Sequence, residues 1–221
     1  MPGKTSICRE LLTKIPNAVL LNGGNLYRAI VYALISSGRD VHELKKYMKN
    51  VDIKHFMDLF KIHLKIENKE TKVYINGELA DEKELQSKES SLAVSLIGGT
   101  ADNSALFEFS RELIEQLRQQ YHVIISGRSL MEIYPNLDYH FFITASLEER
   151  VNRKYIQYEG KETKAEIEDN IKKRDSLQEK AGFYKLYPNT IKIDVTDCKS
   201  IEESTLKVLQ HITYKGNMAM V

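Results

Sequence analysis

The chain has 221 residues, enough to form one large domain with a full hydrophobic core. Its 32 Lys and Arg residues nearly balance 31 Asp and Glu residues, and the formal net charge of +1 argues against bulk electrostatic attraction to nucleic acid or to an anionic membrane. No run of about 18 apolar residues is present, so no membrane span is expected. Two cysteines, Cys8 and Cys198, form neither a disulfide framework nor a metal-binding spacing, which is typical of reduced thiols in a cytoplasmic protein.

The N-terminal residues Gly3-Lys4-Thr5 match the end of a phosphate-binding loop, Gly-x-x-x-x-Gly-Lys-[Ser/Thr]. In such a loop the Lys reaches the β and γ phosphates of a nucleotide and the hydroxyl ligates Mg²⁺. A helix is expected next, because apolar residues follow at helical spacing, namely Ile7, Leu11, Leu12 and Ile15. The first glycine of the loop and the strand before it would precede residue 1. We therefore expect a recorded start that is too short, and weak ATP turnover by residues 1–221 alone.

Short apolar strands alternate with amphipathic helices along the chain, which predicts an α/β fold with a largely parallel sheet. The expected strands are residues 18–21, 123–125, 140–143 and 191–195. The expected helices are residues 25–37, 102–120, 147–158, 163–180 and 200–212. Ser146 and Ser200 are the expected N-caps of two of these helices.

Residues 39–90 interrupt this alternation. Two short helical segments are expected first, and then two strands whose apolar and polar residues alternate, which predicts an antiparallel hairpin with its turn at 68–70. The hairpin strands are residues 63–67 and 72–77. We expect these residues to form a small α+β insert on a core made of residues 1–38 and 91–221.

Glycine, serine and arginine residues follow the predicted strands, and ligands of open α/β sheets bind where the strands end. Asn22-Gly23-Gly24 is expected to form a turn that stops the first strand, with glycines that permit close backbone approach. The cationic residues at or beyond the strand ends are Arg28, Arg128, Arg150, Arg153 and Arg174. Each arginine alone is more often a solvated or ion-paired surface residue. Together they fit phosphoryl transfer, which depends mainly on positioning and charge neutralisation.

These residues together resemble the bacterial cytidylate (CMP/dCMP) kinases, which are nucleoside monophosphate kinases of the P-loop class. The matching segments, in chain order, are Gly3-Lys4-Thr5, Asn22–Arg28, Val73–Glu78, Ala93-Val94-Ser95, Gly127-Arg128-Ser129, Phe142–Arg153 and Lys173-Arg174-Asp175. The match runs nearly from end to end in one order and spacing, so it is far more specific than any single motif.

The resemblance implies one P-loop NTPase-type domain with a parallel sheet flanked by helices. Residues 39–90 would be the insert that binds the acceptor nucleotide, and residues from about 153 to 182 would form a helical lid. The implied reaction is the MgATP-dependent phosphorylation of CMP or dCMP to CDP or dCDP. The resemblance also implies a cytoplasmic monomer with ATP and Mg²⁺ as cofactors and no nucleic acid or membrane partner.

The resemblance also implies a role for each matched site residue. The catalytic residues would be Lys4, Arg128 and Arg174. The residues that contact ATP would be Gly3, Lys4, Thr5, Arg150 and Arg153, with Mg²⁺ on Thr5. The residues that contact the acceptor would be Gly24, Arg28, Ser95, Asn103, Arg128, Ser129 and Arg174.

Four positions depart from the family pattern and leave the acceptor's base and sugar open. Ser129 replaces an Asp, and Asn103 replaces an Arg that helps to read cytosine. Gln178 and Ala181 replace an Asp that contacts the ribose and the Arg that follows it. Tyr184 and Lys185 are candidates to supply the lost contacts. Loss of buried polar partners weakens or alters discrimination between bases.

Two other functions fit part of this pattern. The first is a non-catalytic nucleotide-binding relative, because half of the phosphate-binding loop is not in the sequence. The second is another small-molecule P-loop kinase of the shikimate or adenylate type. The insert motif Tyr74-Ile75-Asn76-Gly77-Glu78 argues against this second function.

Overall fold

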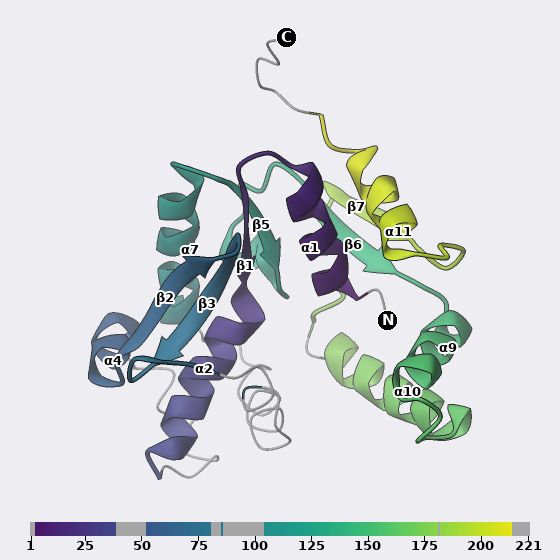
Figure 1. The fold of residues 1–221 in the computed structure, drawn as a ribbon, viewed down its shortest axis with the longest axis horizontal. Coiled ribbons are helices and arrows are strands. Elements are labelled where there is room, and N and C mark those ends of the chain that lie inside the picture. The colour runs from purple at the N-terminus through teal and green to yellow at the C-terminus, as the bar shows by residue number, and fades with distance from the viewer. Residues whose placement is uncertain (1–2, 39–51, 81–84, 86–103, 181, 214–221) are drawn as a thin grey trace. The chain divides into compact units, whose positions relative to one another are not determined.

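The computed structural model describes residues 3–38, 52–80, 85, 104–180 and 182–213 (Figure 1). These residues pack as two compact units. Unit 1 comprises Met1–Leu11, Leu137–Asp175 and Leu186–Val221, and unit 2 comprises Leu12–Asn136 and Ser176–Lys185. The predicted site residues Ser95 and Asn103 and the divergent position Ala181 lie outside the described residues, as do the parts of the insert at 39–51, 81–84 and 86–90. The predicted division into core, insert and lid stays a prediction.

Unit 2 is built on a sheet with strand order β2-β3-β1-β5. Its strands are β1 (Ala18–Asn22), β2 (Ile62–Glu67), β3 (Glu70–Ile75), β4 (Glu78–Leu79) and β5 (His122–Ser126). Parallel pairing joins β1 to β5 along their whole length, and the short strand β4 pairs antiparallel with β3. The predicted hairpin is confirmed, because β2 and β3 pair antiparallel from Ile62↔Ile75 to Glu67↔Glu70.

The hairpin also joins the sheet of β1, which the sequence pattern did not predict. β3 pairs parallel with β1 at Leu20↔Glu70, and the Leu20 N–H donates to the Lys69 carbonyl at 2.8 Å. Beyond this residue pair, the side chain of Thr71 supplies the hydrogen bonds between β3 and β1. Its buried hydroxyl donates to the Leu20 carbonyl at 3.1 Å and accepts from the Asn22 N–H at 3.3 Å. Thr71 therefore adds side-chain hydrogen bonds to the pairing of β1 with β3, which has a single residue pair.

The helices described beside this sheet are α2 (Gly23–Ser36), α4 (Ile53–Leu59), α7 (Ser104–Arg118) and α8 (Leu130–Ile133). Apolar residues from α2, α4, α7, β2 and β3 form one buried cluster, in which Ile30, Leu34 and Phe56 are almost wholly inaccessible to solvent. This burial supplies the main favourable free energy of the unit.

The predicted glycine turn after β1 is wrong, because α2 begins at Gly23 directly after the strand. Asn22 replaces the turn by acting as the N-cap, and its side-chain oxygen accepts from the Asn25 N–H at 3.4 Å. The chain therefore passes from strand to helix without a loop. Gly23 and Gly24 lie in the first helical turn, and Gly24 is exposed.

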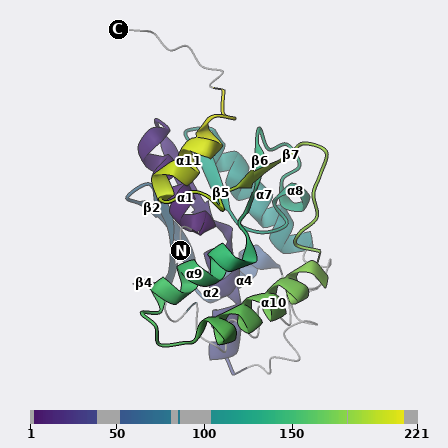
Figure 2. The same cartoon turned by 90° about the vertical axis from the view of Figure 1, so that its right-hand side faces the viewer.

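Unit 1 contains a second, two-stranded sheet in which β6 (His140–Thr144) pairs parallel with β7 (Thr190–Asp194). Its helices are α1 (Lys4–Lys14), α9 (Leu147–Gln157), α10 (Lys164–Lys180) and α11 (Ile201–Leu209), with the last turns of α1 and α10 assigned to unit 2. Figure 2 shows α9 and α10 side by side. The predicted N-caps are confirmed, because Ser146 accepts from the Glu149 N–H and Ser200 accepts from the Glu203 N–H.

The predicted α/β class with a mostly parallel sheet flanked by helices is thus confirmed. Among the described segments, no helix combines the length and the apolar character that crossing a membrane requires.

Replacement of Thr71 by Val is expected to lower the free energy of unfolding by about 1–2 kcal/mol, because the Leu20 carbonyl and the Asn22 N–H lose a buried partner. Thr71→Ser keeps the hydroxyl and is the matched control, with a smaller loss. Urea denaturation of the three proteins measures the difference. Equal midpoints for Thr71→Val and the wild type would show that the hydroxyl does not hold β3 to β1.

Candidate functional site

The carboxyl ends of β1 and β5 lie side by side, because the last register pair of the two strands is Asn22↔Ser126. The segment after β1 carries Gly24 and Arg28 in the first turns of α2. The segment after β5 carries Arg128 and Ser129. Two motifs that are about a hundred residues apart in the sequence therefore start from one edge of the sheet, as the sequence predicted. We call this edge, with Gly24, Arg28, Arg128 and Ser129, the acceptor edge.

The turn after β5 has a constrained backbone. A Cβ atom on Gly127 would lie 2.9 Å from Cδ2 of Leu130, so a larger residue here would require the Leu130 side chain to shift. Ser129 has φ +53°, in the left-handed region, and its carbonyl accepts from the N–H groups of Glu132 and Ile133 at 3.0 Å each. These bonds start α8 immediately after the turn. Arg128 therefore lies directly before a residue whose backbone is constrained.

The guanidinium carbon of Arg128 lies 5.0 Å from the ring centroid of Phe183, within the range of a cation–π contact. Phe183 follows α10, and both side chains are half-buried. One of the divergent positions lies in the same segment, because the Tyr184 hydroxyl donates to Oε1 of Gln178 at 3.1 Å. The sequence pattern identified Tyr184 but gave no role to Phe183.

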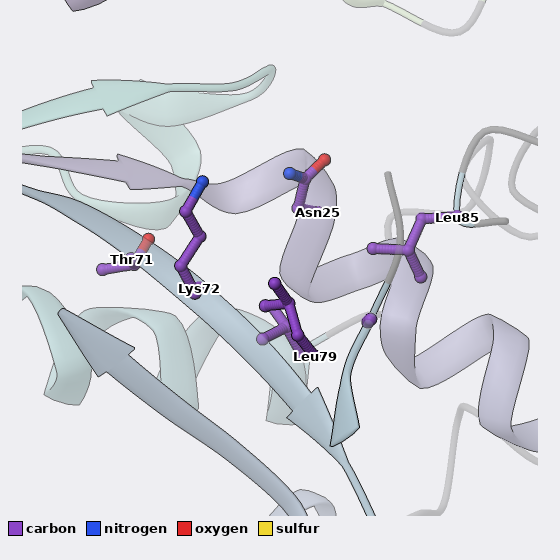
Figure 3. A pocket seen from close by; sticks show the side chains of 7 residues that line it. Asn25, Thr71, Lys72, Leu79 and Leu85 are labelled. Carbon is purple, nitrogen blue, oxygen red and sulfur yellow. The ribbon is translucent and has the colours of Figure 1, made fainter. Parts of the chain in front are cut away.

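A cavity of about 370 Å³ opens beside the first turn of α2 (Figure 3). Its lining residues are Asn25, Thr71, Lys72, Val73, Leu79, Ala80 and Leu85. The polar groups of Asn25 and Lys72 stand among mostly apolar walls, which is the usual composition of a small-molecule site. Neither Asn25 nor Lys72 was predicted to be a site residue. Lys72 belongs to a strand whose alternation of apolar and polar residues is ordinary.

The predicted phosphate-binding residues of unit 1 lie at the start of α1. The Gly3 carbonyl accepts from the N–H groups of Ser6 and Ile7, at 3.0 and 3.2 Å, so the helix begins at Lys4. The predicted apolar residues are buried, with Ile7, Leu11 and Leu12 in the helix and Ile15 directly after its end. The first turn contains no acidic residue, and the positive end of a helix dipole favours an anion. Lys4 and Thr5 thus lie where a phosphate would be favoured.

Arg150 and Arg153 of α9, both predicted to contact ATP, have different partners in the structure. Arg150 forms a two-pronged ion pair with Asp175 of α10, from Nη1 to Oδ2 at 2.6 Å and from Nη2 to Oδ1 at 2.8 Å. This geometry fixes both planar groups. Arg174, the residue before Asp175, is exposed on α10.

Arg153 is buried, with only 8% of its surface exposed. Its Nε donates to Oε1 of Glu149 at 2.6 Å, and its Nη2 donates to the carbonyls of Val195 and Cys198 at 2.7 and 3.1 Å. A buried guanidinium satisfied in this way joins α9 to the segment between β7 and α11. The predicted contact of Arg153 with ATP stays a prediction.

The segment after β7 is itself held by a hydrogen-bonded turn that the sequence did not reveal. The Thr196 hydroxyl and N–H donate to Oδ1 of Asp194 at 2.6 and 2.8 Å, and these bonds hold the pKa of the Asp194 carboxyl below its ordinary value. The Ser146 N–H in turn donates to the Thr196 hydroxyl at 2.9 Å. The start of α9 is thereby tied to the end of β7.

The structure divides the described site residues between the two units. Unit 1 holds Gly3, Lys4, Thr5, Arg150, Arg153 and Arg174. Unit 2 holds Gly24, Arg28, Arg128 and Ser129. Within the described ranges, no group of three His, Cys, Asp or Glu residues is placed to hold a metal ion.

The chain is similar to a known family along almost its whole length. The sequence profile of the family described as cytidylate kinase matches residues 1–214. A cytidylate kinase of Thermotoga maritima is 31% identical over 97% of this chain and 94% of that protein. A cytidylate kinase of Clostridioides difficile is 28% identical over 95% of this chain and 93% of that protein.

Arg153→Met is expected to lower the free energy of unfolding by about 3 kcal/mol, because it leaves Glu149 and two buried carbonyls without their partner. Arg150→Met breaks a half-buried ion pair and should cost about 1 kcal/mol or less. Denaturant unfolding of both variants measures the difference. Equal losses would contradict the buried role of Arg153.

Proposed function

The chain belongs to the cytidylate kinase family, and on that premise we propose that it transfers the γ-phosphoryl group of ATP to CMP or dCMP, giving CDP or dCDP. The observation that carries the proposal is the acceptor edge, where the adjacent ends of β1 and β5 start two arginine-bearing segments. Two cations at one edge suit an acceptor phosphate, whose charge must be neutralised before a second phosphate approaches.

On the donor side, Lys4 binds the β and γ phosphates, the Gly3 segment approaches them, and Thr5 offers its hydroxyl to Mg²⁺. The residues present fit this role, because the first turn of α1 carries a cation and no acidic residue of its own. Bound Mg²⁺ neutralises phosphate charge during transfer. Arg174 adds positive charge from the exposed surface of α10, whereas Arg150 and Arg153 would contact ATP while paired with Asp175 and Glu149.

On the acceptor side, Arg28 and Arg128 hold the phosphate and the α2 turn at Gly24 approaches the nucleotide. Ser129, with Ser95 and Asn103, contacts the base. Neither a covalent nucleophile nor a general base is required, since the protein accelerates the transfer by positioning and charge stabilisation. Exclusion of water sends the phosphoryl group to the acceptor rather than to hydrolysis.

Family membership favours this function over a non-catalytic relative or a kinase of the shikimate or adenylate type. We propose further that the protein acts as a monomer in the cytoplasm. The cytoplasmic location is supported by Cys8 and Cys198, neither of which forms a disulfide within the described residues. Size-exclusion chromatography with light scattering tests the monomer.

A panel of CMP, dCMP, UMP, AMP and shikimate with MgATP is expected to rank CMP and dCMP first by kcat/KM. The ranking of the acceptors, rather than the absolute rate, is the measured quantity, in a coupled assay of ADP release. Lys4→Ala should lower the rate with the best acceptor by at least about a hundredfold, since it removes charge stabilisation at the transferring phosphate. A preference for AMP or shikimate would refute the proposed function.

Ser129→Asp is expected to raise the ratio of kcat/KM for CMP over UMP by about tenfold, because a carboxylate accepts from the amino group of cytosine and repels the carbonyl of uracil. Ser129→Asn is the matched control, since Asn also tolerates the left-handed backbone at this position but offers both a donor and an acceptor. An unchanged ratio in Ser129→Asp would show that residue 129 does not face the base.

A further inference from the structure

Three charged side chains of α7 contact the end of α8. They are Arg111, Glu115 and Arg118, and their spacing of four and three residues places them on one face of the helix. Nε of Arg111 donates to the Ile133 carbonyl at 3.0 Å. The Tyr134 hydroxyl donates to Oε1 of Glu115 and accepts from Nη1 of Arg118. We call these contacts the α7 clamp, and Figure 2 shows α8 beside α7.

Tyr134 is the buried member of the α7 clamp, with 4% of its surface exposed. A buried phenol requires hydrogen-bond partners, and this one has both a donor and an acceptor. The hydrogen bond to Glu115 raises the pKa of the Tyr134 hydroxyl, which therefore remains a donor at neutral pH. Glu115 and Arg118 are exposed, and Nη1 lies 3.7 Å from Oε1 in an ion pair between them. These two residues keep water and each other as partners when the hydroxyl is removed.

Backbone hydrogen bonds join the α7 clamp to the acceptor edge. The Tyr134 N–H donates to the Leu130 carbonyl at 2.7 Å, and the Ile133 N–H donates to the Ser129 carbonyl at 3.0 Å. α8 is therefore continuous with the turn that carries Arg128. The other side of this turn is set by β5, which is paired with β1 along its whole length. The turn thus lies between a paired strand and a clamped helix.

The clamped side of the turn depends on tertiary contacts. α8 is a single helical turn of four residues, and so short a helix has too few hydrogen bonds to be stable by itself. The α7 clamp supplies hydrogen bonds to charged groups, which are stronger than those between neutral groups. A cation on a fixed turn binds an anion more tightly than one on a mobile turn, because less freedom is lost on binding.

We propose that Tyr134 is a positioning residue that fixes α8 through the α7 clamp and thereby sets the position of Arg128 at the acceptor edge; this inference rests on the proposed function. Tyr134 acts through the backbone of residues 129–134 and does not itself touch the substrate. Its hydroxyl is the group that matters, because phenylalanine fills the same space but cannot bind Glu115 and Arg118.

The first experiment measures the Kd of CMP by calorimetry. Tyr134→Phe is expected to raise the Kd about fivefold, because the turn that carries Arg128 is less preorganised. Tyr139→Phe is the matched control in unit 1, since it also removes a phenol hydroxyl, which here donates to the Thr213 carbonyl at 3.0 Å. The control should leave the Kd within about twofold of the wild type, as a change away from the site does. An unchanged Kd in Tyr134→Phe would overturn the proposal.

The second experiment asks whether Tyr134 acts through Arg128. In an Arg128→Met background, Tyr134→Phe should change the Kd of CMP by less than about twofold, because the positioned group is gone. The same rise in both backgrounds would overturn the proposal, since the hydroxyl would then act independently of the arginine. A smaller folded fraction would weaken binding alike in both backgrounds, so this cycle separates positioning from a general loss of stability.

A third measurement tests the α7 clamp without nucleotide, by amide hydrogen exchange followed with NMR. Exchange at Glu132 and Ile133 should be about tenfold faster in Tyr134→Phe than in the wild type, because α8 opens more often. The amides of β5 should keep their rates. Unchanged exchange at Ile133 would overturn the proposal. If the wild type fails to bind CMP and exchange at Ile133 still rises, the proposed function fails while the α7 clamp stands.

Discussion

The parallel pairing of β1 with β5 is the constraint on which the acceptor edge depends. Five consecutive residue pairs, from Ala18↔His122 to Asn22↔Ser126, fix the register and bring both strands to an end at the same level. Four consecutive residues of β1 are buried, so both faces of this strand are covered, as is usual for a strand inside a parallel sheet. Arg28 and Arg128 are neighbours of one edge for this reason, and not because of any local property of their own segments.

Three arginines that look alike in the sequence have three different surroundings. Arg150 pairs with a carboxylate, Arg153 is buried against backbone carbonyls, and Arg128 stacks on a phenyl ring. These surroundings determine how much each side chain can move and what it can still bind. Arg153 joins α9 to the segment after β7 within unit 1, whereas Arg128 has an aromatic ring among its contacts.

Features that depend on neighbouring residues were predictable from the sequence. The apolar runs gave the strands of both sheets, and Ser146 and Ser200 marked the starts of α9 and α11. Features that join distant segments were not predictable. The pairing of β3 with β1 depends on the hydroxyl of Thr71, and the roles of Arg153 and Arg128 depend on partners more than 40 residues away. No periodicity or spacing in the sequence encodes such contacts, so the arginines were identified but their surroundings were not.

The left-handed backbone at Ser129 restricts how this position can evolve. At φ +53°, Gly, Asn and Asp are tolerated best, and β-branched residues such as Thr or Val are strongly disfavoured whatever their chemistry. A substitution is therefore accepted at this position only if the new residue can adopt the left-handed backbone, whatever its effect on function. The residue type at this position therefore reflects the backbone conformation as well as the substrate. Relatives can be compared for substrate preference only where their residues here adopt the left-handed conformation equally well.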